Sequence, residues 1–551
     1  MKKLKDFLAA LRVKSSTLIL IATFYFAFAM NVSFWRYIFT HLEITNAATA
    51  WFALSLPFFM AIPLYLIFSL TIVPKVAKPL LCVLLLLCAA TNYMMTRYGI
   101  YIDKNMIQNV FETNAREATD LMTASYVFWY FVSGILPAAL VCAVKIDYGD
   151  AKTEVKARLK KSLIAMLIVS MFAGTAFKEY ASFGRNNRTA FRGLINIFNF
   201  VSGTKGHLKR LRLANRQLLI LDDKAEKDEE EDGLITVLVF ILGETARAAN
   251  FSLNGYERDT NPLLAKQDIV YFKEMTSCGT ATAFSVPCMF SHMVRSNFDS
   301  TDAQYTQNLI DLLQTGGYDI IWVDNDDGCK GVCARVEKTE YTVKTNNPKY
   351  CNGQYCLDGV LLESLETALK NVKKDTVVVL HAMGSHGPTY FRRYPDEFKK
   401  FTPTCDTADI QNCTTQEIVN TYDNTILYTD YVVSSAIDIL KKFPHFEGGL
   451  IYVSDHGESL GENNIYLHGM PYTIAPKEQI EVPMVLFMNE NMKRFDFVDY
   501  DCMKKVAQTT MHSHDNLFHS ILGLLEINTK EYDQNLDLFR ACRTKKLRFE
   551  K

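Results

Sequence analysis

The first third of the chain alternates long apolar stretches with short charged segments. A helix needs about 20 apolar residues to cross a bilayer, and most of these stretches approach that length. Burying so many in a soluble protein is disfavoured because their charged flanks would be hard to bury. The pattern predicts a transmembrane domain of five helices over residues 1–181. The stretches lie in residues 16–39, 49–73, 79–95, 123–144 and 162–177, and the third and fifth are short.

Lys and Arg in the short loops predict the orientation of this domain. They are frequent in residues 2–14, 75–78 and 145–161 and scarcer in the intervening loops. Because cytoplasmic loops are rich in these residues, we expect a cytoplasmic N-terminus and, after five crossings, a C-terminal part outside. The small-residue pattern Ala27-Phe28-Ala29 is also compatible with signal-peptide cleavage, although the apolar run continues to Phe39.

Residues 182–233 have a different character from the stretches before them. An aromatic segment at 194–201 and a basic segment at 206–216 precede an acidic run at 224–232. We expect a helix on or near the membrane surface, followed by an exposed acidic linker.

Residues 234–551 alternate short apolar runs with amphipathic segments. Continuous apolar strands separated by helical lengths are typical of a parallel sheet covered on both faces, so we predict an α/β domain. Ligands in such folds bind beyond the carboxyl ends of the strands. The predicted strands are 234–242, 319–323, 376–380, 448–454 and 482–488.

Cysteine spacing gives an independent indication of the compartment. Of 13 cysteines, all but three lie in the C-terminal part, most at short spacings. This pattern favours disulfides in an oxidising, periplasm-like compartment. Zinc–thiolate sites are the rival interpretation, but a repeated C-x-x-C pair is missing. The expected pairs are Cys278 with Cys288, Cys329 with Cys333, Cys351 with Cys356, Cys405 with Cys413 and, by elimination, Cys502 with Cys542.

Composition excludes two broad classes of protein. With 49% apolar and 22% charged residues, the chain is too apolar to be disordered. The 59 Lys and Arg residues are balanced by 60 Asp and Glu residues, so nothing supports a nucleic-acid partner.

Candidate metal ligands follow three of the predicted strands. Glu244 follows the first, His381 and His386 the third, and Asp455 with His456 the fourth. An isolated Asp-His pair is more often structural, but the coincidence at three strand ends favours a metal site. A mixture of carboxylate and imidazole suits zinc.

The segment between Cys278 and Cys288 supplies small hydroxyl residues. A Thr hydroxyl is a poor nucleophile unless a base or metal lowers its pKa, so an attacking Thr must lie on the metal. Composition alone favours a Thr-rich turn or helix cap, and it does not choose between Thr280 and Thr282.

Several segments together resemble the phosphoethanolamine transferases of Gram-negative envelopes, which include the lipid A enzymes and the mobile colistin resistance enzymes. The resemblance covers nearly the whole chain and implies an alkaline phosphatase/sulfatase-like fold for residues 234–551. The segments are GETARAANFSLNGYERDTNPLL (243–264), TSCGTATAFSVPCMFS (276–291), WVDNDDGCKGVC (322–333), GSHGPTY (384–390) and YVSDHGESLGENNIYLHG (452–469).

The resemblance also implies a site. Its nucleophile would be Thr282, and one zinc would be bound by Glu244, Thr282, Asp455 and His456.

Around that zinc, the resemblance implies residues that bind substrate. His386 and His468 would flank the site and bind the substrate phosphate or a second zinc, and Lys330 would lie near the phosphoethanolamine group. One departure is Asp326, where the family often has Asn four residues before this Lys; its role is unassigned.

An outer loop at 109–121 resembles the loop that approaches the catalytic domain in the family. By position, its substrate-side residues would be Asn109, Thr113 and Glu117. Without the resemblance, the residues of this segment would predict only a polar amphipathic helix.

The implied reaction is a transfer of phosphoethanolamine from phosphatidylethanolamine, through phospho-Thr282, to lipid A phosphate or another lipopolysaccharide group. We expect a monomeric inner-membrane enzyme with a periplasmic catalytic domain, linked to polymyxin resistance. Hydrolysis by the same machinery is the main alternative, since water can replace the acceptor. A sulfatase is disfavoured because the sequence after Cys278 lacks Pro and Arg at the required offsets. A membrane-bound sensor with purely structural zinc is a further rival.

Overall fold

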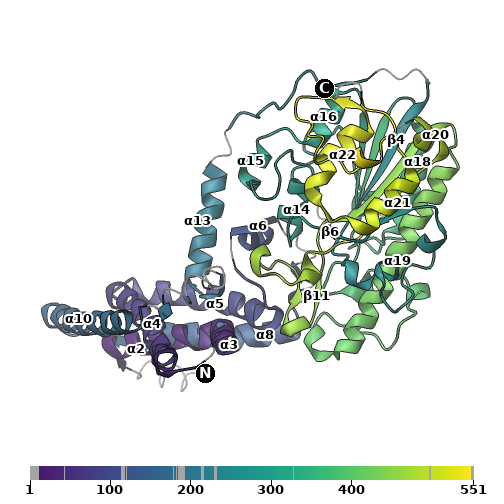
Figure 1. Cartoon of the computed structure of the whole chain (residues 1–551). Helices are drawn as coiled ribbons and strands as arrows, with labels where there is room; N and C mark the ends of the chain where they lie inside the picture. The colour runs from purple at the N-terminus through teal and green to yellow at the C-terminus, as the bar shows by residue number, and fades with distance from the viewer. Residues whose placement is uncertain are drawn as a thin grey trace. The chain divides into compact units, whose positions relative to one another are not determined.

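The computed structural model consists of two compact units, which Figure 1 shows as a helical part and an α/β part. The first comprises Met1–Ile107 with Met122–Gly206, and the second comprises Gln108–Leu121 with His207–Lys551. The structure describes residues 12–42, 44–102, 104–112, 118–119, 121–177, 179–180, 183, 191, 193–212, 216–228, 233–326, 328–345, 347–495 and 498–547.

The first unit is built from long apolar helices. Many of their large apolar side chains, such as Phe24 and Leu70, are exposed, as expected for lipid-facing positions. A short parallel pair, β1 (Arg12–Lys14) and β2 (Lys145–Asp147), accompanies the helices. The helical elements are α2 (Ser15–Ala27), η1 (Ala29–Asn31), α3 (Val32–His41), α4 (Ala47–Thr71), α5 (Ala77–Tyr98), α8 (Ala124–Tyr130), the π-helical η2 (Phe131–Ile135), α9 (Leu136–Ala143) and α10 (Ala151–Thr175).

The prediction of five spans is wrong in its count. Within the described residues, four helical segments are long and apolar enough to cross a membrane: Ser15–His41, Ala47–Thr71, Ala77–Tyr98 and Ala124–Ala143. The predicted fifth stretch, 162–177, lies mostly in α10, whose first half carries Arg158, Lys160 and Lys161. These charges leave too short an apolar length in the helix. The prediction that the C-terminal part lies outside relied on an odd number of spans, so this support is lost. The cysteine pattern remains as the independent indication of the compartment.

The connecting stretch differs from the predicted surface helix and free linker. Helix α13 spans Phe198–Arg212, but Leu194, Asn196 and Asn199 before and within it are buried in the helical unit. Asn196 donates hydrogen bonds to the carbonyls of Met30 and Cys88, at 3.0 Å each.

The acidic run begins as part of the second unit. Its residues Glu226–Lys227 form β3, which pairs with β15 (Ile527–Asn528). Lys227 also forms an ion pair with Asp375, at 2.9 Å. The first half of the run is thus bound to the α/β unit instead of being an exposed linker, and residues 229–232 lie outside the described part.

A seven-stranded sheet forms the centre of the second unit, in the order β5-β13-β10-β4-β9-β7-β8. All five predicted strands are present, as β4 (Ile235–Gly243), β7 (Asp319–Asp324), β9 (Thr376–His381), β10 (Phe446–Ser454) and β13 (Met484–Met488). The edge strands β5 (Val270–Phe272) and β8 (Lys338–Tyr341) were not predicted. The sheet is mixed, because β13 is antiparallel to both of its neighbours.

Both faces of this sheet are covered, as the continuous apolar strands predict. Leu238, Phe240 and Leu242 of β4 join one core with residues of α14, α16 and α22. Alternation along the strand turns the residues between them to the other face, where α18 and α19 pack against β9 and β10 (Figure 1). From Thr282 onward, the α-helices of the second unit are α14 (Thr282–Met289), α15 (Ser300–Gln304), α16 (Leu309–Thr315), α17 (Thr342–Thr345), α18 (Gly359–Asn371), α19 (Thr415–Lys441), α20 (Glu490–Phe495), α21 (Tyr500–Thr509) and α22 (Leu517–Leu524).

Smaller elements complete the second unit. Two short pairs lie near the ends of the central strands: β6 (Met275–Thr276) with β14 (His512–Ser513), and β11 (Ser459–Leu460) with β12 (Tyr466–Leu467). Helix α6 (Lys104–Glu112) contributes its last residues to this unit. All five predicted disulfides are confirmed.

Candidate active site

Two adjacent parallel strands bring the first candidate ligands together. Strand β4 ends at Gly243, directly before Glu244, and β10 ends at Ser454, directly before Asp455 and His456. Gly243 and Ser454 are paired in the sheet, so these side chains leave the same edge side by side. Glu244, Asp455 and His456 are all buried.

Thr282 completes this group from the first residue of α14. Its Oγ1 lies 3.2 and 3.3 Å from the two carboxylate oxygens of Glu244 and 3.3 Å from Nε2 of His456. Thr280 instead donates a hydrogen bond to the Met470 carbonyl, at 2.5 Å. The geometry therefore separates the two threonines that the sequence leaves equivalent.

The spacing of these atoms fits a tetrahedral metal. Nε2 of His456 lies 3.4 Å from Oε1 of Glu244 and 3.4 Å from Oδ2 of Asp455. Zinc bonds to nitrogen and oxygen of about 2.0–2.1 Å place neighbouring ligands of a tetrahedron about 3.3 Å apart. Oδ2 of Asp455 is moreover buried with no hydrogen-bond partner, which is unusual for a carboxylate unless a cation binds it.

Neighbouring groups orient the ligands. Nδ1 of His456 lies 2.9 Å from the Gly457 carbonyl, which can only accept, so Nδ1 carries the proton and Nε2 offers its lone pair to the site. Oδ1 of Asp455 accepts from the backbone N–H of His456 at 2.7 Å and of Thr245 at 3.2 Å. These contacts leave Oδ2 directed at the site.

Burial makes the site electrostatically favourable for a cation. Burial raises the pKa of Asp455 to about 7, and burial together with the Asp455 charge raises the pKa of Glu244. Burial lowers the pKa of His456 to about 4, so this imidazole is neutral at pH 7. Burial thus disfavours the ionised form of both carboxyls, and a bound cation would stabilise that form. The neutral imidazole is the form that binds a metal.

His386 and His468 lie beside this group. The ring of His468 is centred 4.4 Å from that of His456, and the ring of His386 is centred 5.4 Å from that of His468. The two predicted substrate residues are therefore brought together with the ligand set.

The remaining predicted residues have different positions. Lys330 lies in the loop closed by Cys329 and Cys333 and lines a cavity of about 510 Å³ together with Pro287 of α14 and Arg335. None of the four candidate ligands is among the residues that line it. Asn109 belongs to the same compact unit as Thr282. Thr113 and Glu117 lie outside the described residues.

Comparison with known proteins identifies the family. A sequence model described as phosphoethanolamine transferase EptA/EptB matches residues 59–211, and the sulfatase model matches residues 236–527. Phosphoethanolamine transferase EptA of Escherichia coli K12 is 41% identical over 95% of this chain and 96% of its own length. The chain belongs to the EptA-type phosphoethanolamine transferase family. Phosphatidylethanolamine transferase Mcr-1 from Escherichia coli is 36% identical over 82% of this chain and 84% of its own.

A solved structure supports the same assignment to the family. The integral membrane lipooligosaccharide phosphoethanolamine transferase A of Neisseria meningitidis aligns with a TM-score of 0.93 and 37% identity, covering 97% of this chain and 99% of that one. The resemblance found in the sequence is thus confirmed for the family and for a membrane part joined to a sulfatase-like part.

The sequence interpretation assigned no role to three residues near this site. Glu458, next to the Asp455-His456 pair, is buried within 3.4 Å of His468. Asp324 ends β7 and contacts His381, at 3.1 Å. Asp326, left unassigned, lies 3.7 Å from the other nitrogen of His381. The run of polar residues at the end of β7 draws attention to the last two, but it does not identify His381 as their partner.

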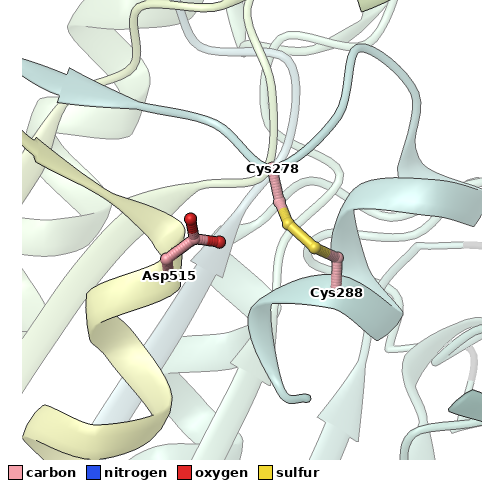
Figure 2. A group of neighbouring side chains, drawn as sticks. All are labelled: Cys278, Cys288 and Asp515. Carbon is pink, nitrogen blue, oxygen red and sulfur yellow. A yellow bond between two sulfur atoms is a disulfide. The ribbon is translucent and has the colours of Figure 1, made fainter. Parts of the chain in front are cut away.

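Cys278, Cys288 and Asp515 also lie close together, as Figure 2 shows. Both sulfur atoms are joined in a disulfide, so neither is a thiolate that could bind a metal. Asp515 accepts a hydrogen bond from the backbone N–H of Arg295, at 2.7 Å. This group is therefore structural: the disulfide ties the loop that precedes Thr282 to α14.

Proposed function

We propose that this enzyme transfers phosphoethanolamine from phosphatidylethanolamine to a phosphate of lipid A, or to another group of lipopolysaccharide, through an ester on Thr282. The observation that carries the proposal is the position of the Thr282 hydroxyl, within 3.3 Å of both Glu244 and His456. A hydroxyl buried between a carboxylate and an imidazole at a helix N-terminus is suited to nucleophilic attack.

Zinc is the metal that this set of donors favours, with Glu244, Asp455 and His456 as ligands and Thr282 as the fourth. When bound, zinc lowers the pKa of the Thr282 hydroxyl and polarises a phosphoryl oxygen.

In the first step, Oγ1 of Thr282 forms a bond to phosphorus, and the phosphorus–oxygen bond to diacylglycerol breaks. The Thr282 hydroxyl donates a hydrogen bond to Glu244, which is positioned to accept its proton and pass it to the leaving oxygen, so that diacylglycerol leaves as an alcohol. In the second step, an oxygen of a singly protonated acceptor phosphate forms the new bond to phosphorus, the bond to Oγ1 breaks, and the proton of the acceptor returns Thr282 to its hydroxyl form.

A helix N-terminus and two imidazoles near Thr282 support this chemistry. The N-terminus of α14 carries partial positive charge that stabilises a phosphorylated Thr282. His386 and His468 are positioned to donate to the phosphoryl oxygens, where one preorganised donor is worth about 3–4 kcal/mol in related chemistry. Lys330, Asn109, Thr113 and Glu117 remain our candidates for contacts with the rest of the substrate.

The membrane part fits a substrate with acyl chains, because it confines enzyme and donor to one plane. We assign the chain to the inner membrane as a monomer with its α/β unit in the periplasm, where the five disulfides are stable. The ammonium added to lipid A would offset one phosphate charge and weaken the attraction of cationic peptides such as polymyxin.

Peptide mass spectrometry of the full-length enzyme, incubated with phosphatidylethanolamine without acceptor, tests this proposal. We expect a phosphoethanolamine adduct on Thr282 in the peptide that spans Cys278 to Cys288. Release of diacylglycerol without an adduct, together with free phosphoethanolamine that added lipid A does not reduce, would favour the hydrolase alternative. If zinc-loaded enzyme releases no diacylglycerol, the assignment of the donor is wrong.

A further inference from the structure

We propose that Glu244, Asp326 and His381 bind a second divalent cation beside the Thr282 centre. This inference rests on the proposed function only in sharing Glu244 with that centre, and it assigns a role to the unexplained Asp326.

The sheet topology brings these three residues together. Strands β4, β9 and β7 are neighbours and parallel, with Leu242 paired to His381 and His381 paired to Asp324. Glu244 lies two residues after Leu242, and Asp326 lies two residues after Asp324. All three side chains therefore leave the same edge of the sheet as Asp455 and His456, on the opposite side of Glu244.

Their ligand atoms are close enough to share an ion. One oxygen from each carboxylate and one nitrogen of His381 lie within 4.8 Å of one another. Opposite ligands of an octahedral ion with bonds of about 2.1 Å are about 4.2 Å apart, so small movements would close the set around a cation. Glu244 and His381 are buried, and the Asp326 side chain is 6% exposed.

His381 is oriented as a metal ligand. Its Nδ1 lies 3.1 Å from Oδ2 of Asp324, a carboxylate also held by the Trp322 indole N–H at 3.0 Å. This contact fixes a proton on Nδ1 and leaves Nε2 as the position for a metal or a second proton. Nε2 is buried, has no hydrogen-bond partner, and lies 3.7 Å from Oδ2 of Asp326. A carboxylate on one nitrogen and a metal on the other is the usual arrangement of a ligating histidine.

The charge balance favours a cation at this position. Within the described part of the chain, Glu244 and Asp326 form ion pairs with histidines alone. Asp324 adds a third carboxylate, which contacts the same imidazole. One protonated imidazole offsets only one of these three negative charges, and a divalent ion would offset more of the cost of burying them. The competing occupant is a proton on His381.

The donor set of two carboxylates and one imidazole, with remaining positions for water, suits Mn²⁺ or Mg²⁺ as well as zinc. Mn²⁺ is the practical probe because its electron paramagnetic resonance signal reports binding without any assay of transfer.

The test uses full-length enzyme in detergent, carrying one equivalent of zinc and titrated with Mn²⁺. We expect two metal ions per chain in the wild type, and a second ion lost or weakened at least tenfold in Asp326→Asn and in His381→Gln. His468→Gln is the matched control, because it alters the alternative location of a second metal beside His386 and should leave both ions bound.

Three results would overturn the inference. They are a single metal per chain in the wild type, as expected for a proton on His381; unchanged Mn²⁺ binding in folded Asp326→Asn; or loss of the second ion in His468→Gln alone. If both variants misfold by circular dichroism, the anomalous difference map of Mn²⁺-soaked wild-type crystals decides, with a peak among the three side chains expected. An adduct on Thr282 with one metal per chain refutes this inference alone, and two metals without the adduct refute the proposed function alone.

Discussion

A carboxylate oxygen of Glu458 lies 3.4 Å from Nδ1 of His468. Glu458 directly precedes β11 and His468 directly follows β12, and the pairing of Ser459 with Leu467 in this hairpin sets the two side chains opposite each other. The hairpin therefore places His468 beside the Thr282 centre, and the Glu458 carboxyl orients its ring.

This relationship predicts that Glu458→Gln impairs transfer by altering the position and protonation of His468. Residues that orient a functional histidine typically affect activity by about 10–100-fold. We expect a loss in kcat of that size at unchanged zinc content, and steady-state kinetics with metal analysis would measure it. In a His468→Gln background the same substitution should add little; a full additional loss would mean that Glu458 acts elsewhere.

The nucleophile assignment predicts different outcomes for two neighbouring threonines. Thr282→Val removes the attacking oxygen and should lower transfer by at least about a thousandfold, whereas Thr282→Ser keeps a hydroxyl and should retain measurable transfer. Thr280→Val is the matched control, since it loses a hydrogen bond to Met470 worth about 1 kcal/mol. Comparable inactivation by both valine variants would argue against a special role for Thr282.

Gly384 supports Glu244 through the backbone. Its φ is +51°, and a Cβ at this position would overlap the Glu244 carbonyl oxygen. Gly384→Ala should therefore displace Glu244 and weaken zinc binding by at least about tenfold, which competition with a chelating dye would measure.

Gly353→Ala is the control for backbone strain alone. Its φ is +83°, with open space around the position of a Cβ. We expect a stability cost of about 1–2 kcal/mol and unchanged zinc affinity. Equal zinc affinity in the two variants would show that the contact with Glu244 is unimportant.

The buried carboxyls predict how stability depends on pH in metal-free enzyme. Burial raises the pKa of Asp455 to about 7 and that of Glu458 to about 8, whereas unfolded carboxyls titrate near about 4. At these two carboxyls the folded state thus binds more protons than the unfolded state, which lowers the free energy of unfolding as pH rises. Burial lowers the pKa of His456 and His519 to about 4, which acts in the opposite direction below about pH 6.5, so we expect the net fall above that pH.

Thermal unfolding of chelator-treated enzyme from about pH 6.5 to 8 would test this expectation. The midpoint should fall with rising pH after zinc removal, while zinc-loaded enzyme should not show the fall, because metal binding strengthens as the ligands lose protons. Glu458→Gln should flatten the upper part of the trend. A rising midpoint in the metal-free enzyme would contradict the assigned pKa directions.

Much of the architecture is predictable because buried parallel strands have a strong sequence pattern. All five apolar runs from β4 to β13 are strands, but β5 and β8 are too short to be distinguished from loops. The direction of β13 is not encoded in its apolar residues, so the antiparallel strand was missed. The fifth span failed because apolar length was judged without the charged half of α10.

The candidate site divides along similar lines. Glu244, Asp455 and His456 follow directly from strand ends, since adjacent parallel strands release their next residues at one edge. Choosing Thr282 over Thr280 required either the family resemblance or the position of α14. Glu458 and Asp326 depend on side-chain partners that are distant in sequence, such as His468 and His381, and spacing alone does not reveal them.

Each of the five disulfides joins two cysteines that are consecutive along the chain. Four of these bonds have sequence separations of 4, 5, 8 and 10, and the last, Cys502–Cys542, has a separation of 40. If the α/β unit is exported from its N- to its C-terminus, as we propose, the second cysteine of each pair is the next one to emerge after the first. Short loops close at little entropic cost, so simple sequential oxidation yields the native pairing. We therefore expect maturation of this enzyme to need a thiol oxidant but no catalyst of disulfide reshuffling.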